Sequence, residues 1–340
     1  MIKKKTTPYR VIALIILLVI AFTFIFPFYW ILTGSLKSQS VAIAMPPEWF
    51  PLSPTLDNFV KLFKNPALKW LFNTVFIALA SMVLVCLTAS LAGYALAKKR
   101  FYGQSIVFSL IVCAMALPKQ VVLVPLVRIM ANLRQSCLLI AIFVVVALVI
   151  LAVVLSAIHK KFTLKSVQAV IAVVVVIAAA VAMWMLLMPG LLGKVGGKGL
   201  ADTLWAVILP TVGWPFGVFL MKQFSETIPT ALLEAARIDG AGEMRTFLTV
   251  VCPIIKPGFG ALAIFTFINT WNDYFLQLIM LQSRSNLTIS LGIATLQAEF
   301  ATNYGLLMAG AALGAVPIVT IFLIFQKFFT QGITMGAVKG

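Results

Sequence analysis

Long apolar runs recur along this chain and alternate with short polar segments. A helix needs about 20 predominantly apolar residues to cross a bilayer. Runs of about that length predict eight spans, near residues 11–33, 70–97, 104–127, 136–158, 167–189, 202–222, 258–281 and 304–326. The pattern therefore predicts an all-α polytopic membrane protein with both termini on the same side of the membrane.

Prolines mark the places where this regular pattern changes. Five prolines within residues 34–69 predict an irregular segment with at most a short helix near residues 56–63. Pro118 interrupts the third run and is followed by Lys119. Proline removes a donor from the helical hydrogen-bond ladder, and the freed carbonyls need partners at membrane depth. We therefore expect a broken helix at this position, near the outer surface.

Composition agrees with a membrane protein, since 62% of the 340 residues are hydrophobic and only 10% are charged. Soluble proteins average about 25% charged residues. The net charge of +17 does not indicate nucleic-acid binding, because the basic residues form short clusters between the apolar runs. That distribution follows the positive-inside rule and suits anionic lipid headgroups. It favours cytoplasmic termini, and the uncharged run 11–36 is too long for a signal peptide.

The chain lacks the usual residues of catalytic and metal sites. Its four cysteines have no metal-ligand spacing, and His159 is its only histidine. No Walker A pattern is present, so we expect no ATP hydrolysis by this chain. We predict no catalytic residue, no metal and no cofactor, which disfavours an integral-membrane enzyme.

A polar island at residues 225–257 separates two apolar runs. Pro229 suits the start of a helix over residues 230–238, and Gly240 or Gly242 can end it. A second helix over residues 243–251 is expected to stop at Pro253. An ordinary solvated loop is the alternative interpretation of these residues.

The spacing within this island carries a resemblance. Glu234-Ala235-Ala236, Gly240 after three intervening residues, and Pro253 match the pattern E-A-A-x3-G-x9-I-x-L-P, with Val250 and Cys252 replacing Ile and Leu. This resembles the EAA loop of ABC importer permeases. The resemblance implies a short coupling helix that docks on an ATPase subunit through Glu234, Ala235, Ala236, Asp239, Gly240 and Pro253.

Two further segments resemble the carbohydrate (maltose-type) permeases of that family, namely Trp271-Asn272-Asp273-Tyr274 and the ending at residues 325–340. The resemblance implies a type I ABC importer permease fold. It also implies that the tail 327–340 touches the ATPase pair. The tail residues expected in that contact are Gln331, Gly332, Gly336, Val338 and Lys339.

The resemblance covers residues 1–134 and 199–340, and the family usually has six spans. Residues 135–198 are therefore expected to be an inserted transmembrane hairpin. The expected division of the chain is as follows: an amino-terminal tail and first span at 1–33, an extracytoplasmic loop at 34–69, core spans at 70–134, the hairpin at 135–198, and core spans at 199–340 that include the coupling loop 225–257.

By resemblance, the chain imports a mono- or oligosaccharide that an extracytoplasmic solute-binding protein delivers. The implied partners are a homologous second permease and an ATPase dimer that binds ATP and magnesium, in a bacterial or archaeal inner membrane. Two alternatives remain, an ABC importer of a non-sugar solute and an ion-coupled secondary transporter. Secondary transporters usually show inverted repeats, and no repeat is evident here.

Asp273 is the acidic residue deepest within an apolar run, and intramembrane acids often have a function. We expect Asn269, Trp271, Asn272 and Asp273 to line the sugar path, since Trp stacks on sugar rings and Asn and Asp bond hydroxyls. The alternative is a polar contact with the second permease. Lys119 is expected to reach the outer headgroups.

Overall fold

The computed structural model describes residues 8–132, 199–299 and 303–337, and every regular element within these ranges is a helix. The expected hairpin at 135–198 lies outside the described residues, as do His159, Val338 and Lys339. The fold prediction of an all-α protein is confirmed for the part of the chain that the structure describes.

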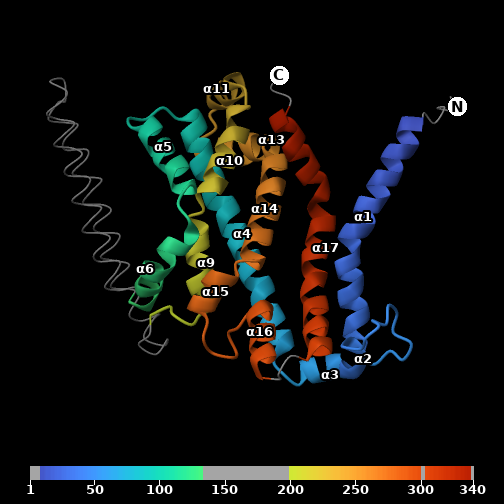
Figure 1. The fold of residues 1–340 in the computed structure, drawn as a ribbon. Coiled ribbons are helices and arrows are strands. Elements are labelled where there is room, and N and C mark those ends of the chain that lie inside the picture. Colours follow the sequence, from blue (N-terminus) through green and yellow to red (C-terminus); the bar gives the residue numbers. More distant parts are fainter. Residues whose placement is uncertain (1–7, 133–198, 300–302, 338–340) are drawn as a thin grey trace.

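Within the described ranges, three helices are long and apolar enough to cross a membrane unaided: α1 (Pro8–Ser35), α4 (Ala67–Lys98) and α17 (Tyr304–Ala337). α4 lies at the centre of the bundle and packs against the helices around it, while α1 packs mainly on α17 (Figure 1). Most side chains of α1 are exposed, as suits a helix surrounded largely by lipid.

Three further apolar segments of the described residues are bent pairs of shorter helices. Their bounds are α5 (Gln104–Met115) with α6 (Lys119–Ala131), α9 (Leu204–Val212) with α10 (Pro215–Glu226), and the run α12 (Glu243–Thr246), η1 (Phe247–Val251, a π-helix) and α13 (Cys252–Ile254) with α14 (Lys256–Trp271). The bends are 103°, 41° and 80°, in that order. If each pair is one span, the described residues contain up to six spans.

Proline accounts for two of these bends. Pro118 is the extended residue that precedes α6, so the break predicted there is confirmed. Pro215 opens α10, and it holds Trp214 in the extended conformation that residues before proline prefer. Pro253 acts differently from our expectation, because the helical path continues through it to Ile254.

The prediction of one continuous span at 258–281 is wrong. α14 ends at Trp271, and α15 (Tyr274–Met280) begins after a break at Asn272 and Asp273. Asp273 caps α15, since its carboxylate accepts a hydrogen bond from the Leu276 amide at 3.4 Å. No proline or glycine marks this break, so the apolar pattern gave no sign of it.

The two ends of the bundle differ. α11 (Thr230–Ile238), the start of α1 and the end of α17 lie at one end, called here the α11 end (Figure 1). The opposite end carries α2 (Gln39–Ala42), α3 (Asp57–Phe63) and α16 (Ile289–Glu299). α3 confirms the short helix expected near residues 56–63.

The core forms two apolar clusters along α4. One cluster contains Trp70, Ile77 and Phe267, and the other, toward the α11 end, contains Met221 and Phe247. Gly93 lets α4 and α10 approach backbone to backbone, because a Cβ there would lie 2.6 Å from the Lys222 amide nitrogen. Both clusters include residues of α4, so the helices of the two clusters pack on this one helix.

Candidate functional sites

The polar island folds into a short helix with defined ends. Pro229 stands before α11 in an extended conformation, and Gly240 follows α11 with a φ of 75°. The Gly240 amide donates to the Arg237 carbonyl and the Ala241 amide to the Ala236 carbonyl. This pair of bonds is a Schellman motif, which needs a left-handed residue at Gly240. The helix predicted over residues 230–238 is confirmed.

The two faces of α11 have different surroundings. Leu233 and Ala236 are buried, and Leu233 belongs to the cluster that contains Met221 and Phe247. The opposite face exposes Glu234, Ala235 and Asp239, together with an apolar side chain, Ile238, that is 86% exposed. An isoleucine side chain that stays in water does not gain the stabilisation that burial would give it. An exposed apolar residue at this position therefore indicates a contact surface.

This exposed surface extends beyond α11. Leu232 of the same helix, Met244 of α12 and Leu248 of η1 are also exposed large apolar residues. Of the predicted coupling residues, Glu234, Ala235, Asp239 and Gly240 are exposed, while Ala236 faces the core and Pro253 lies exposed in α13. We call the exposed set Leu232, Glu234, Ala235, Ile238, Asp239, Gly240, Met244 and Leu248 the α11 surface.

Ion pairs hold the α11 surface in place. Lys99, just after α4, pairs with Glu243, and the Arg237 guanidinium lies 3.3 Å from the same carboxylate. The hydrogen bond from Lys99 and the two positive charges hold the pKa of the Glu243 carboxyl below its usual value. The Tyr94 and Phe247 rings pack with centroids 5.5 Å apart. α4 therefore anchors the segment that follows α11.

The predicted tail contact falls on the end of α17. The helix continues through Gln331, Gly332 and Gly336 to Ala337, at the α11 end of the bundle (Figure 1). The two remaining tail residues, Val338 and Lys339, lie outside the described residues. The part of the tail that is described thus lies at the same end of the bundle as the α11 surface.

A second candidate site lies where three helices are interrupted. The helix breaks after α5, α9 and α14 meet around a cavity of about 320 Å³. Within a bilayer, irregular backbone is tolerated only where it is buried in protein or lines a water-filled space. The polar residues that line the cavity are Lys119, Gln120, Thr211, Thr266, Asn269, Thr270 and Asp273.

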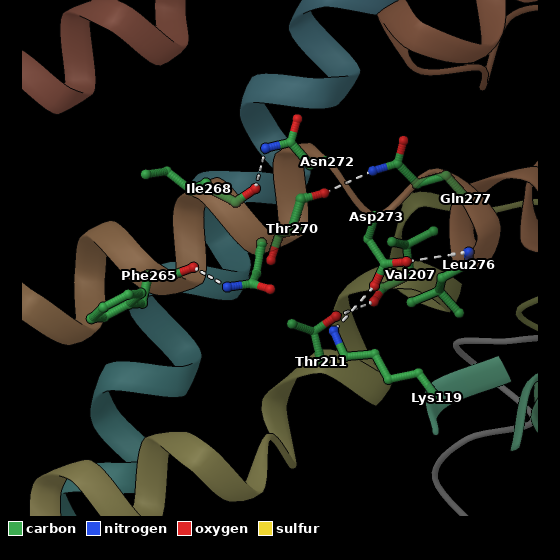
Figure 2. Close-up of polar contacts among 11 residues, drawn as sticks. Lys119, Val207, Thr211, Phe265, Ile268, Thr270, Asn272, Asp273, Leu276 and Gln277 are labelled. Atoms are coloured by element: carbon green, nitrogen blue, oxygen red, sulfur yellow. Dashed lines mark hydrogen bonds and ion pairs between the residues drawn. The ribbon is translucent and has the colours of Figure 1, made fainter. Parts of the chain in front are cut away.

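Lys119 and Asp273 are the charged residues among those that line the cavity. The Lys119 Nζ lies 3.7 Å from an Asp273 carboxylate oxygen, and Figure 2 shows the two side chains pointing toward each other. Their side chains are 56% and 22% exposed. Asp273 at the start of α15 is therefore an ion-pair partner for Lys119 within the bundle, and the expected contact of Lys119 with the outer headgroups stays a prediction.

The four residues expected on a sugar path do not share one surface. Asn269 lines the cavity and donates to the Phe265 carbonyl at 2.9 Å. Trp271 is 5% exposed and stacks on Phe267 in the core, so it does not face the cavity. Asn272 is exposed and donates to the Ile268 carbonyl at 3.0 Å, outside the cavity lining (Figure 2).

Thr266, Thr270 and the aromatic residue Trp214 also line the cavity, although they were not predicted as site residues. Thr266, Asn269, Thr270 and Asp273 recur at intervals of three and four residues. That spacing places side chains on one face of a helix, so it could have revealed the polar face of α14. Trp214 gave no such signal, because it lies alone in the break before α10.

Within the described residues, no group of three or more His, Cys, Asp or Glu side chains could hold a metal ion. The side chains described at the two sites form hydrogen bonds and ion pairs, and those of the α11 surface include exposed apolar residues.

Comparison with known proteins places the chain in a family. The family described as binding-protein-dependent transport system inner membrane component matches residues 149–335. The arabinooligosaccharides transport system permease protein AraQ of Bacillus subtilis is 27% identical over 98% of this chain and 96% of its own length. The maltodextrin transport system permease protein MdxG of the same species is 31% identical over 86% of this chain and 83% of its own length.

Two further similarities extend the comparison. The sulfoquinovosyl glycerol transport system permease protein SmoH of Agrobacterium fabrum is 30% identical over 98% of this chain and 94% of its own length. A chain of a bacterial ABC transporter involved in the import of the acidic polysaccharide alginate shares the fold, with a TM-score of 0.64, 16% identity, and coverage of 97% of this chain and 99% of that chain. The chain belongs to the family of binding-protein-dependent transport system inner membrane components.

Proposed function

We propose that this chain is the membrane-spanning permease of an ATP-driven importer that moves a mono- or oligosaccharide into the cytoplasm. The names of its relatives support a sugar as the solute, since they include permeases for arabinooligosaccharides, maltodextrin and melibiose. The observation that carries the coupling role is the exposed apolar Ile238 on a helix that is held to the bundle through the buried Leu233 and Ala236.

The partners follow from this role. A homologous second permease would pair with this chain, a solute-binding protein would deliver the sugar from outside, and an ATPase dimer would bind ATP and magnesium. The chain itself would catalyse no reaction. In this arrangement the α11 end, with both termini, faces the cytoplasm, and α2, α3 and α16 face outward.

The connection between the α11 surface and the cavity supports mechanical coupling. From α11 the chain runs through α12, η1 and α13 into α14. α14 carries Thr266, Asn269 and Thr270 to the cavity. A displacement of α11 by the ATPase would therefore be transmitted along covalently joined helices to the cavity lining, with the bend before Lys256 as the natural hinge.

Replacing Glu234 by alanine tests the coupling role. The carboxylate is exposed in the described structure, so Glu234→Ala should leave membrane insertion and thermal stability unchanged. Truncating one partner of a charge pair buried in an interface costs about 2–5 kcal/mol. We therefore expect loss of sugar uptake and loss of ATPase copurification.

Glu226→Ala is the matched control, because Glu226 is a carboxylate at the same end of the bundle that pairs with Lys222 at 2.5 Å and lies outside α11. It should retain uptake. Normal uptake and normal ATPase copurification by Glu234→Ala would reject the docking role. Uptake that persists without ATP but collapses with the ion gradient would instead favour a secondary transporter.

A further inference from the structure

We propose that the cavity between α6, α9 and α14 is a sugar-binding site of this chain, and that the Lys119–Asp273 pair restricts it to uncharged sugars. This inference rests on the proposed import function and names the substrate class of the site. The chain then selects its solute within the membrane as well as through any binding protein.

The form of the cavity suits a sugar. Its volume of about 320 Å³ lies at the small end of the range of pockets that enclose small ligands. Substrate sites of membrane transporters often form where helices are discontinuous near the bilayer midplane. Here the residues that line the cavity come from three helix breaks, and their side chains combine hydroxyl, amide and charged groups with apolar surface.

An unsatisfied hydroxyl indicates that the site takes a polar ligand. Thr270 is 2% exposed and lines the cavity, and its hydroxyl oxygen has no hydrogen-bond partner within the described residues. A buried hydroxyl without a partner is costly, so such a group calls for an explanation. A sugar hydroxyl in the cavity would either donate to the Thr270 oxygen or accept from the Thr270 hydroxyl.

Aromatic surface completes a sugar-type lining. Trp214 lines the cavity and is only partly buried, with its ring 5.1 Å from that of Phe216. The apolar face of a sugar ring packs well on an indole, whose polar edge can remain hydrated. Trp214 therefore takes the stacking role that was predicted for Trp271.

The ion pair sets the charge preference. Lys119 offers donors and Asp273 offers acceptors at 3.7 Å, so the net charge of the cavity is zero. The hydroxyls of a neutral sugar can bond to both groups without leaving either charge unpaired. A carboxylate on the sugar would compete with Asp273 for Lys119 and leave a charge uncompensated, which is costly at membrane depth.

Sugar binding to the purified complex tests this assignment without the contribution of the solute-binding protein. The complex of both permeases and the ATPase pair is prepared in detergent. Dissociation constants are then measured by equilibrium dialysis for neutral trisaccharides, raffinose and maltotriose, and for trigalacturonic acid. The wild-type complex should bind a neutral trisaccharide at least about tenfold more tightly than the acidic one.

The variants shift this ratio in opposite directions. Asp273→Asn leaves Lys119 unpaired and should raise relative affinity for trigalacturonic acid at least about tenfold, whereas Lys119→Met should lower it further. The double variant, Lys119→Met with Asp273→Asn, should restore the neutral preference. Thr270→Val should weaken the binding of neutral and acidic trisaccharides equally, without lowering the thermal stability of the complex.

An unchanged ratio in Asp273→Asn and Lys119→Met would overturn the inference. Loss of permease pairing at an unchanged ratio would also overturn it, because the ion pair would then serve contact with the second permease. If ATP drives sugar uptake but the purified complex binds no sugar in the dialysis assay, only the assignment of the cavity as a sugar-binding site is refuted. Absence of ATP-driven uptake of every sugar tested refutes the proposed function itself.

Discussion

Gly240 and Gly242 lie two residues apart after α11, but their backbones differ. Gly240 has a φ of 75°, whereas Gly242 precedes α12 with a φ of −67°. A Cβ at either position would meet no atom within 4 Å. Steric crowding is therefore absent at both glycines, and only the left-handed backbone of Gly240 opposes a side chain.

We predict that Gly240→Ala impairs coupling and that Gly242→Ala does not. A left-handed conformation costs an alanine roughly 1–2 kcal/mol, which would distort the Schellman motif that ends α11. ATPase copurification and sugar-stimulated ATP hydrolysis should fall in Gly240→Ala alone, while membrane insertion stays normal in both variants. Equal activities of the two variants would show that the turn geometry is unimportant.

At the scale of elements, the Lys99–Glu243 and Arg237–Glu243 pairs join α4, α11 and α12. The pKa of Glu243 lies below its ordinary value of 4.5, mainly because Lys99 donates a hydrogen bond to the carboxylate. A lowered carboxyl pKa stabilises the folded arrangement above pH 4.5, and this contribution is lost as the pH falls through the folded-state value. Exposed ion pairs contribute about 0.2–1 kcal/mol.

We therefore predict that a nitroxide label at Met244, which is exposed on α12, gains mobility as the pH is lowered below about 4.5. In Glu243→Gln the label should already be mobile at pH 7 and should respond little to acid. Glu226→Gln, which leaves both pairs intact, serves as the control. A label whose mobility is the same in wild type and Glu243→Gln at pH 7 would contradict the anchoring role.

At the scale of the whole molecule, the described residues on either side of 133–198 lie together. The Leu200 amide donates to the Met130 carbonyl at 2.9 Å, and a Cβ at Gly199 would lie 2.4 Å from the Ala131 carbonyl oxygen. The segment that ends α6 and the segment that begins at Gly199 could therefore be connected directly without rearranging α6 or α9.

We predict that joining Arg134 to Gly199 gives a protein that still inserts, assembles and supports sugar-stimulated ATP hydrolysis. Removing an even number of expected spans leaves the α11 surface on its original side of the membrane. Deleting residues 135–166 alone is the control, because the loss of one expected span would reverse the orientation of the remaining ones and abolish coupling. Failure of the full deletion to assemble would show that residues 135–198 belong to the core.

The sequence by itself determined the apolar segments that form the long helices α1, α4 and α17, and it determined the α11 helix. Membrane partition depends on the apolar content of each segment, and Pro229 and Gly240 act through their own backbones, so these features are local. The match of Glu234, Gly240 and Pro253 to the EAA spacing also needed no coordinates. For the same reason the break at Pro118 was predictable, since proline alone disrupts the helix.

Only the tertiary structure decided which polar groups meet. Lys119 and Asp273 are far apart along the chain, and their contact depends on the 103° bend after α5 and on the break after α14. The rotation of α14 against α4 turns Trp271 into the core and Asn269 toward the cavity, although the two residues are close in the sequence. Packing fixes that rotation, and the hydropathy pattern of a single helix does not specify it.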